Sequence, residues 1–312
     1  MKNLNSSLKN SIISVIIPIY NQEHFIAKYF KNFEKLYHKN IEFIFIDDAS
    51  TDNTVKIIKK LIISKKNHNF KFYKLKKNGG PGIARNLGIK KSSGNNLLFL
   101  DSDDYLIKKN LLKIIKFISL KQNYNLILID YLKRKNKQMK ICKKKLLGKT
   151  IVKLFLRTEL DMCSNFYLFD KNFLIKNKIS FLKGYYEDIL FMLKVFFYMK
   201  KFYIFDKKVY IKNTNPNSIT NTFTKKHVVD FINATFQKKN FFDKEIRPKI
   251  KNLERDCQYG LRGDYMFSNK INNKIKTKKL KKSFIDNKFR KLIINNFMIK
   301  TSYDSQVKKR LF

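Results

Sequence analysis

The chain has 312 residues, of which 44% are hydrophobic and 14% aromatic, so it can bury a large core and is not intrinsically disordered. Its 68 Lys and Arg residues against 24 Asp and Glu residues give a formal net charge of +44 at pH 7, which first suggests a nucleic acid or an anionic membrane as a partner. Only eight of the basic residues are Arg, which base recognition favours, and the sequence contains no zinc finger, basic zipper or aromatic ribonucleoprotein motif. We therefore expect no dedicated binding of nucleic acid.

Membrane spans, disulfides and zinc sites are not expected either. No uninterrupted apolar run approaches the roughly 18 residues that a membrane span needs, and the apolar stretch 12–19 is short and contains Pro18. Cys142, Cys163 and Cys257 lack Cys-x-x-Cys spacing, and the four His residues lack metal-ligand spacing. We expect a reduced, cytoplasmic protein.

Strand and helix patterns alternate through the first third of the chain. Runs rich in β-branched and aromatic residues predict strands at 12–17, 41–47, 70–75 and 96–100, with helical spacing between them at about 22–37, 52–65 and 81–91. This alternation predicts an α/β fold with a mainly parallel central sheet flanked by helices. Ligands of such sheets bind beyond the carboxyl ends of the strands, where three polar segments stand: Tyr20-Asn21, Asp47 to Ser50 and Asp101 to Asp104.

The remaining chain has a looser pattern. It predicts, in order, a helix near 108–121, a strand near 125–131, an exposed Lys-rich connector at 133–149, an amphipathic helix at 187–200 and a strand near 202–211. Residues 270–312 hold 14 Lys and Arg against two Asp, so this tail is either a solvated helical segment with one packed face or an element that contacts anionic lipid. The predicted organisation is one domain over 1–225, with halves 1–106 and 107–225, and a helical Lys-rich extension over 226–312.

Two acidic turns follow predicted strands, and each has two interpretations. The turn from Asp47 to Asp52 offers carboxylates that could accept hydrogen bonds from a uracil ring and ribose hydroxyls, or that could cap the next helix. The turn from Asp101 to Asp104 holds three carboxylates within four residues, and a bound Mg²⁺ or Mn²⁺ shared with a diphosphate would relieve their repulsion. The alternative for this second turn is an Asx-turn that caps a helix.

Two further segments carry candidate chemistry. Gly79-Gly80-Pro81-Gly82-Ile83-Ala84-Arg85-Asn86 leads into a helix, and Arg85 could contact a diphosphate, support nearby carboxylates or simply lie exposed beside a tight turn. The spacing matches neither a Walker loop nor the dinucleotide-binding glycine motif. Glu187-Asp188 opens the amphipathic helix, where acids commonly favour the helix dipole, but one of them would serve as a base if the upstream site is real.

Together these residues resemble the family-2 inverting glycosyltransferases with a GT-A fold. The resemblance is carried by Ser14 to Asn21, the acidic turn at Asp47 to Asp52, the segment Asn78 to Asn86 and the Asp-x-Asp motif in Phe99 to Tyr105, and more thinly by Glu187-Asp188 and Asn215 to Thr220. It implies a UDP-sugar donor and a bound Mn²⁺ or Mg²⁺. The implied roles are metal binding by Asp103 and Asp101, donor-nucleotide binding by Pro18, Tyr20, Asp48, Arg85, Asp101 and Ser102, and base catalysis by Asp188, with Glu187 as the alternative.

The sequence departs from the family pattern on the acceptor side. Many relatives place a Trp where this chain has Ser164-Asn165-Phe166-Tyr167, and the chain contains no Trp. Phe166, Tyr167, Tyr185 and Tyr186 are therefore candidates for stacking on an acceptor sugar, with core packing as the alternative.

The resemblance implies that the acceptor is a glycan or a lipid-linked glycan of a bacterial cell-surface polysaccharide or lipooligosaccharide. The basic tail 270–312 would then place the protein peripherally on the inner face of the cytoplasmic membrane. Two other functions compete with this one: a nucleotidyltransferase, and a basic module that binds nucleic acid or polyanions. A nucleotidyltransferase usually has a Gly-rich basic loop after the first strand, and this chain lacks one. In a basic binding module, the acidic turns would only cap helices.

Overall fold

The computed structural model describes residues 13–65, 69–120, 124–131, 148–160, 162–213, 223–275 and 280–294. The chain divides into two compact units, Met1–Asn221 and Thr222–Phe312. The predicted Asn215 to Thr220 segment and nearly all of the predicted connector 133–149 lie outside the described residues.

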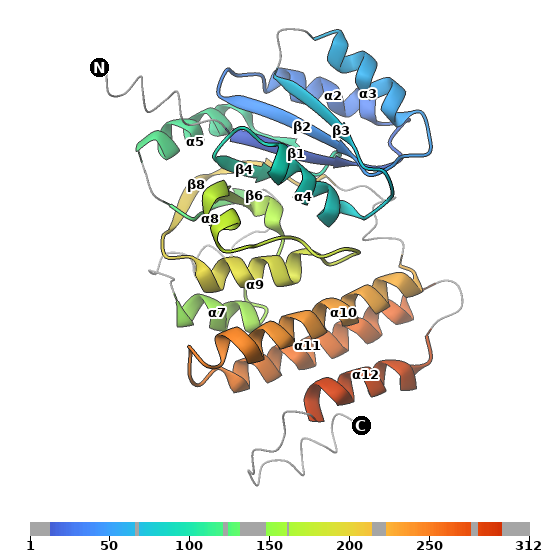
Figure 1. Ribbon diagram of the computed structural model, residues 1–312, viewed down its shortest axis with the longest axis vertical. Coiled ribbons are helices and arrows are strands. Elements are labelled where there is room, and N and C mark those ends of the chain that lie inside the picture. The colour runs from blue at the N-terminus through green and yellow to red at the C-terminus, as the bar shows by residue number, and fades with distance from the viewer. Residues whose placement is uncertain are drawn as a thin grey trace. The chain divides into compact units, whose positions relative to one another are not determined.

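The first unit is built on a mixed sheet in which eight described strands follow the order β3-β2-β1-β4-β7-β6-β8-β5 (Figure 1). Strands β3, β2, β1 and β4 run parallel, whereas β7 pairs antiparallel with both β4 and β6. The remaining pairs are a parallel β6–β8 and an antiparallel β5–β8. The strands are β1 (Ile13–Ile19), β2 (Ile41–Asp47), β3 (Phe70–Lys74), β4 (Asn96–Phe99), β5 (Tyr105–Leu106), β6 (Leu126–Tyr131), β7 (Tyr167–Asp170) and β8 (Phe202–Ile211).

Helices flank this sheet, which confirms the predicted fold class. The chain passes from β1 to β2 to β3 in one direction and then returns to β4, so right-handed connections place α2 and α3 on one face and α4 on the other. The helices of this unit are α2 (Ile26–Lys35), α3 (Thr54–Ile63), α4 (Pro81–Lys91), α5 (Lys108–Leu120), α7 (Lys149–Leu156), α8 (Lys171–Lys176) and α9 (Asp188–Tyr198), with a 3₁₀ turn η1 (Ser164–Phe166).

The four strands predicted in the first third are present, each within two residues of its expected ends. Strand β1 continues through Pro18 to Ile19, although the sequence pattern places its end at residue 17. Proline is tolerated in this central strand because β4 leaves the ladder opposite Ile16, so no β4 residue pairs with Pro18. The pattern did not predict β5 or β7, because strands of two and four residues are too short to show a period.

Buried phenylalanines fill the interior between α2 and the parallel strands. Phe30 packs edge-on against Phe70 with ring centroids 5.0 Å apart, and Phe33 packs on Phe45 at 5.4 Å. Phe43 contacts Phe70 at 5.5 Å. These contacts hold α2 against β2 and β3.

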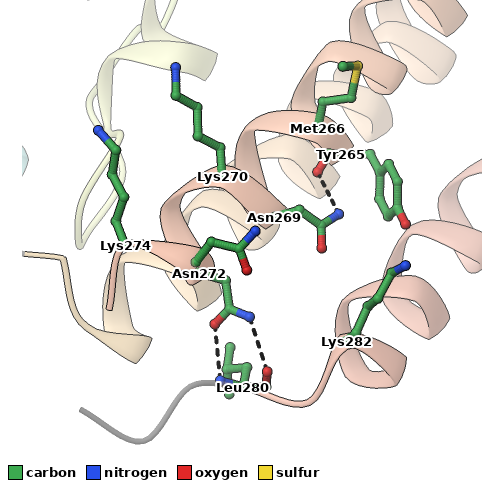
Figure 2. Close-up of a pocket in the computed structure, with 9 residues that line it drawn as sticks. Tyr265, Met266, Asn269, Lys270, Asn272, Lys274, Leu280 and Lys282 are labelled. Atoms are coloured by element: carbon green, nitrogen blue, oxygen red, sulfur yellow. Dashed lines mark hydrogen bonds between the residues drawn. The ribbon is translucent and has the colours of Figure 1, made fainter. Parts of the chain in front are cut away.

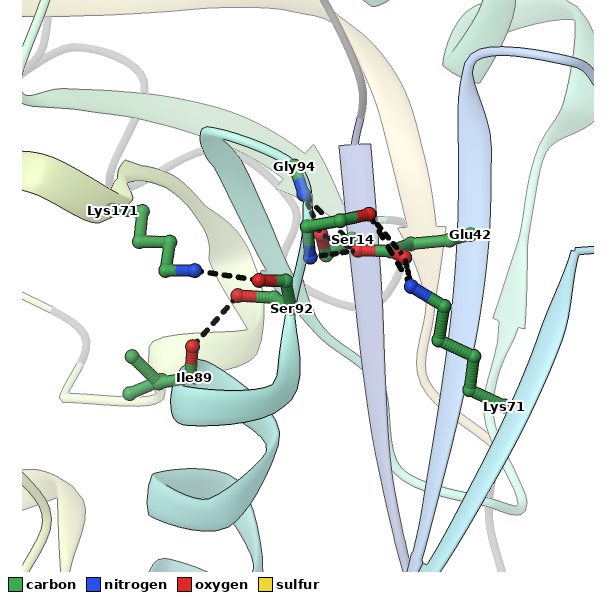
Figure 3. A network of polar contacts seen from close by, with 8 residues as sticks. Ser14, Glu42, Lys71, Ile89, Ser92, Gly94 and Lys171 are labelled. Atoms are coloured by element: carbon green, nitrogen blue, oxygen red, sulfur yellow. Dashed lines mark hydrogen bonds and ion pairs between the residues drawn. The ribbon is translucent and has the colours of Figure 1, made fainter.

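A buried polar network closes the opposite, amino-terminal edge of the same strands (Figure 3). The Glu42 carboxylate on β2 is fully buried and accepts hydrogen bonds from the Lys71 ammonium at 2.6 Å and the Ser93 hydroxyl at 2.7 Å. The Ser14 hydroxyl on β1 also donates to Glu42, and Gly94 N–H donates to Ser14 at 3.0 Å. The network therefore ties β1, β2, β3 and the turn before β4 together.

The second unit is helical. It contains α10 (Lys225–Phe241), a π-helical turn η2 (Phe242–Ile246), α11 (Glu254–Asn273) and α12 (Lys282–Ile294). Apolar residues such as Phe231, Leu261 and Ile285 are buried in it, and Lys238 and Asp264 form a buried ion pair between α10 and α11. None of the helices described in either unit combines the length and apolar character that crossing a membrane requires.

Candidate active site

The polar residues predicted at the strand ends meet at one edge of the sheet. Strands β1, β2 and β4 are parallel and end at Ile19, Asp47 and Phe99, so the segments that follow them share this edge. The loops after β1 and β2 are joined directly, because Thr51 N–H donates to the Asn21 side chain at 3.0 Å and Asn21 N–H donates to the Ser50 hydroxyl at 2.9 Å. Within the first of these loops, Tyr20 is 44% exposed.

The Asp48 carboxylate holds the glycine turn that precedes α4. Gly79 N–H donates to one carboxylate oxygen at 2.7 Å and Gly80 N–H donates to the other at 2.8 Å. Burial raises the pKa of Asp48, and these two hydrogen bonds oppose that rise. Asp48 does not cap α3, whose N-cap position is Asn53; the carboxylate that accepts a hydrogen bond at this helix start is Asp52, from Thr54 N–H at 3.0 Å.

The amino-terminal half of α4 clamps the loop that leads to α9. The Asn86 side chain donates to the Phe181 carbonyl and accepts from the Phe181 N–H, both at 2.9 Å. A Cβ atom on Gly82 would lie 2.4 Å from the Leu182 carbonyl oxygen and 2.9 Å from the Glu187 side chain. Only glycine permits this close approach of helix and loop.

Arg85 bridges the two acidic segments that are far apart in the sequence. Its Nη2 atom lies 2.9 Å from Asp101 Oδ1, and its Nη1 atom pairs with the Glu187 carboxylate. The guanidinium also lies over the Phe181 ring, 5.5 Å from its centroid. Burial alone would lower the pKa of Arg85, but the charges of Glu187 and Asp101 outweigh it and raise the pKa. The alternative of an exposed Arg beside a plain turn is wrong, since only 5% of this side chain is exposed.

An aromatic cluster positions both partners of Arg85. Phe99 ends β4, two residues before Asp101, and its ring packs edge-on against Phe181 at 5.1 Å. Phe191 of α9 stacks face to face on Phe181 with centroids 3.8 Å apart. Because Glu187 immediately precedes α9, the same cluster fixes the start of that helix relative to β4.

Glu187 and Asp188 occupy different surroundings although they are adjacent. Glu187 is buried against Arg85. Asp188 is half-buried, and its Oδ1 atom is fully buried without a hydrogen-bond partner among the residues that the structure describes. Burial, together with the neighbouring Glu187 charge, raises the pKa of Asp188 to about 7, against the opposing charge of Arg85. A carboxylate with an oxygen that accepts no hydrogen bond and a pKa near neutrality suits proton transfer.

The three carboxylates of the second acidic turn also differ. Burial tends to raise the pKa of Asp101, but the charge of Arg85 lowers it, so this carboxylate stays ionised. Asp104 is buried, and both of its oxygens are engaged, one by the Tyr210 hydroxyl and the other by Asn213 N–H at 2.6 Å. Burial and the Asp101 charge raise the pKa of Asp104 to about 7. Asp103 is half-buried.

The donor set fits a divalent cation only if the substrate supplies ligands too. Asp101 and Asp103 offer carboxylate oxygens, the ligands that Mg²⁺ and Mn²⁺ prefer, whereas the oxygens of Asp104 are committed to Tyr210 and Asn213. Among the described residues, no group of three or more His, Cys, Asp or Glu side chains gathers in a way that could hold a metal ion. One or two carboxylates completed by diphosphate oxygens is a common arrangement for Mg²⁺.

Three further residues at this site were not predicted: Asn165, Tyr210 and Lys212. Tyr210, at the end of β8, receives a hydrogen bond from the buried Asn165 side chain at 3.0 Å and passes one on to Asp104. Burial alone would lower the pKa of Lys212, but the charge of Asp101 outweighs burial, so the pKa of Lys212 is raised. Because the chain contains many Lys residues, no local sequence pattern distinguishes Lys212 as a site residue.

The structure also separates the four aromatic candidates for acceptor stacking. Phe166 is 4% exposed and Tyr167 is 2% exposed, so both belong to the core. Tyr185 and Tyr186 are half-buried in the loop before Glu187, and Tyr186 has a backbone φ of 61°, an uncommon conformation for a bulky residue. Ser102 is 7% exposed, and Pro18 lies near the end of β1.

Comparison with known proteins agrees with this geometry. A family model described as glycosyl transferase family 2 matches residues 14–212. An uncharacterized glycosyltransferase of Rickettsia bellii is 40% identical over 111 residues, which are 36% of this chain and 16% of that protein. The poly(ribitol-phosphate) beta-N-acetylglucosaminyltransferase TarS of Staphylococcus aureus is 39% identical over 108 residues, which are 34% of this chain and 18% of TarS. The match thus spans less than half the length of these curated relatives.

Solved structures share the fold. The crystal structure of residues 1–349 of S. aureus TarS in complex with UDP-GlcNAc superposes with a TM-score of 0.58 at 21% identity, covering 85% of this chain and 84% of that one. The mannosyltransferase PcManGT from Pyrobaculum calidifontis, in complex with GDP-Man and Mn²⁺, gives a TM-score of 0.55 at 14% identity, covering 84% of this chain and 73% of that one. The shared architecture is the GT-A fold.

Proposed function

The chain belongs to glycosyl transferase family 2, and on this basis we propose that it transfers a sugar from a UDP-sugar to a hydroxyl group of a glycan or lipid-linked acceptor, with inversion at the anomeric carbon. The observation that carries the proposal is the bridge made by Arg85, which holds the Asp-x-Asp turn through Asp101 and the acidic pair through Glu187. This bridge joins Asp101 and Glu187, the residue before the proposed base Asp188, to one buried guanidinium. The family assignment also favours a glycosyltransferase over a nucleotidyltransferase or a basic binding module.

The donor nucleotide is proposed to bind at the edge formed by the β1 and β2 loops. Pro18 and Tyr20 would flank the base, and Asp48, Asp101 and Ser102 would contact its polar edge and the ribose. Asp48 already accepts two hydrogen bonds from Gly79 and Gly80, which fixes the direction of its remaining lone pairs. That TarS was crystallised with UDP-GlcNAc supports a uridine donor for a chain of this fold.

Asp103, together with Asp101, is proposed to hold Mn²⁺ or Mg²⁺. When bound, the cation supplies Lewis-acid stabilisation of the charge that develops on the leaving diphosphate. Both terminal nitrogens of Arg85 pair with carboxylates, so its proposed role is to keep Asp101 ionised and in place, and not to contact the diphosphate itself. Lys212, whose ammonium feels the charges of Asp101 and Asp103, would add positive charge on the same side.

Asp188 is proposed to act as the base. The acceptor hydroxyl oxygen forms a bond to the anomeric carbon while the bond from that carbon to the diphosphate oxygen breaks, and Asp188 takes the hydroxyl proton. Its Oδ1 atom accepts no hydrogen bond from the described residues, whereas the Glu187 carboxylate is engaged by Arg85. Glu187 would then tune the pKa of Asp188 and hold the start of α9.

The decisive experiment is calorimetric titration of UDP with and without Mn²⁺ into the wild type and into Asp103→Asn. We expect Mn²⁺-dependent binding that the substitution removes. Asp206→Asn serves as the matched control, because its side chain is 75% exposed and lies 3.5 Å from Lys207. Well-folded protein that binds no UDP in the presence of Mn²⁺ would contradict the proposed donor.

Membrane contact through residues 270–312 remains a prediction, as does the bacterial surface glycan as acceptor. The described part of this tail exposes Lys281, Phe284 and Lys288 on and beside α12. The double substitution Lys281→Glu and Lys288→Glu reverses the charge and leaves α11 whole. A deletion from residue 270 would remove the end of that helix. We expect weaker flotation with anionic vesicles and unchanged UDP binding; unchanged flotation would count against the contact.

A further inference from the structure

The second unit contains a pocket of about 820 Å³ beside the carboxyl-terminal half of α11 and the start of α12 (Figure 2). Cavities of this size accommodate small organic ligands or a short oligosaccharide. The donor-site argument uses none of the residues that line it.

The charge around the pocket has one sign. Lys270, Lys274 and Lys282 line it, and none of its described lining residues carries a carboxylate. Elsewhere in the unit lysines pair with acids, for example Lys238 with Asp264 and Lys249 with Glu245. The three pocket lysines form no ion pair with any described residue, although the Lys274 ammonium lies over the Phe223 ring, 5.5 Å from its centroid. No described carboxylate therefore offsets their positive charge.

Amide groups make up most of the other polar lining. Asn272 is used by the fold, because its side chain donates to the Leu280 carbonyl at 3.1 Å and accepts from the Leu280 N–H at 3.0 Å, which fixes the chain entering α12. Asn269 donates to the Tyr265 carbonyl at 3.1 Å, and its side-chain oxygen has no hydrogen-bond partner among the described residues. The exposed Asn273 amide likewise has no partner within that part of the chain.

An aromatic ring completes the wall. The Tyr265 hydroxyl donates to Asp286 at 2.8 Å, which fixes the ring. Met266, which is 70% exposed, extends the apolar surface beside it. An aromatic face with amide donors and acceptors is a common way to bind sugar rings and their hydroxyls, and ammonium groups bind phosphate.

We propose that this pocket binds a phosphate-bearing oligosaccharide, the anionic part of the acceptor. The inference rests on the proposed function for its assignment to the acceptor. Lysine charge alone would serve equally for a lipid headgroup, but a concave site with free amides beside an aromatic ring suits a glycan with hydroxyls to recognise.

The test uses the full chain and a phosphorylated mannopentaose, with the neutral mannopentaose as its comparison. We expect the phosphorylated sugar to bind more tightly, and Lys270→Gln, Lys274→Gln and Lys282→Gln together to weaken it by about tenfold or more, as loss of charge-assisted contacts implies. The control triple Lys225→Gln, Lys244→Gln and Lys251→Gln removes the same charge from exposed positions of the same unit that do not line the pocket. Asn273→Leu should weaken the sugar but not inorganic pyrophosphate.

Several outcomes would overturn the pocket proposal. One is an equal loss of sugar binding in both triple variants, and another is no preference for the phosphorylated sugar. A third is that the pocket triple weakens binding to anionic vesicles but not to the phosphorylated sugar, which would identify a lipid contact instead. UDP binding is measured on the same samples. Wild type that binds the phosphorylated sugar but no UDP would contradict the proposed donor while leaving the pocket intact, and the reverse result would contradict only the pocket.

Discussion

Arg85 and Glu187 are 102 positions apart in the chain, yet their side chains form an ion pair in which both are almost completely buried. A second carboxylate, Asp101, occupies the other end of the same guanidinium at 2.9 Å. Burying a charge is costly unless it is paired, so each of these groups depends on the others. The bridge therefore couples the folding of the Asp-x-Asp turn to the placement of the acidic pair.

Replacing Arg85 should damage both stability and transfer. Arg85→Gln leaves Glu187 buried without its partner, and we expect the free energy of unfolding in urea to fall by about 3 kcal/mol. Arg85→Lys keeps the charge but cannot reach two carboxylates with a planar fork, so transfer should remain impaired. The control is Arg157→Gln, whose side chain is 39% exposed beside Glu159 and should change stability by about 1 kcal/mol or less. Equal losses for Arg85→Gln and Arg157→Gln would show that the bridge has no special weight.

The acid limb of the pH profile should report Asp188. A base must be ionised, and burial with the Glu187 charge raises the pKa of Asp188 to about 7, so kcat/KM should rise with pH through about 7 and then level off. Glu187→Gln removes a charge that raises this pKa, so the limb should move to lower pH. Asp188→Asn should abolish transfer while UDP binding survives. Near-normal turnover in Asp188→Asn together with its loss in Glu187→Gln would exchange the two roles.

Two glycine substitutions form a matched pair. Gly82→Ala drives a Cβ to within 2.4 Å of the Leu182 carbonyl oxygen and 2.9 Å of Glu187, so it should displace the loop, reduce transfer and cost about 1–3 kcal/mol. Gly263→Ala on α11 has no atom within 4 Å of the new Cβ and should stabilise the protein by roughly 0.5–1 kcal/mol. Thermal unfolding and a transfer assay measure both effects. Wild-type transfer in a folded Gly82→Ala protein would mean that the site does not need this close approach.

Glu42 should make stability depend on acid. Burial raises its pKa, but hydrogen bonds from Lys71, Ser14 and Ser93 outweigh burial and lower the pKa from 4.5 to about 2. Because the unfolded chain binds this proton more tightly, the contribution is complete above pH 4.5 and is lost as pH falls towards 2. A shift of this size corresponds to about 3 kcal/mol.

Urea unfolding from pH 6 to pH 2.5 tests this expectation. Glu42→Gln should be less stable at pH 6 and should show a shallower loss of stability in acid. Glu159→Gln, at an acid whose side chain is 40% exposed, should keep the wild-type slope. If the free energy of unfolding of Glu42→Gln fell with pH as steeply as that of the wild type, the acid sensitivity would come from other carboxylates.

The strands and helices of the first third follow from local pattern. Strand β2 and helix α4 have the expected ends because their hydrophobic periods and their Gly-Pro and Asp boundaries are contained in contiguous residues. The sequence also singled out Asp101, Arg85 and the Glu187-Asp188 pair as site candidates, because they stand at a predicted strand end, one turn into a predicted helix and at a predicted helix start. Strand β7 was not predicted because four residues are too few to show a hydrophobic period. Its antiparallel position between β4 and β6 depends on pairing with residues far away in the sequence.

The sequence by itself determined the α/β class, the family resemblance and which residue types stand at the strand ends. Only the tertiary structure decided which of those residues are committed to each other: Asp48 to Gly79 and Gly80, Asp104 to Tyr210 and Asn213, and Arg85 to Asp101 and Glu187. It likewise placed Phe166 and Tyr167 in the core and gathered Lys270, Lys274 and Lys282 around a pocket in the second unit. The physical reason is that secondary structure follows from the period of neighbouring residues, whereas burial, pairing and the pKa of a side chain depend on groups brought close by packing across many positions of the chain.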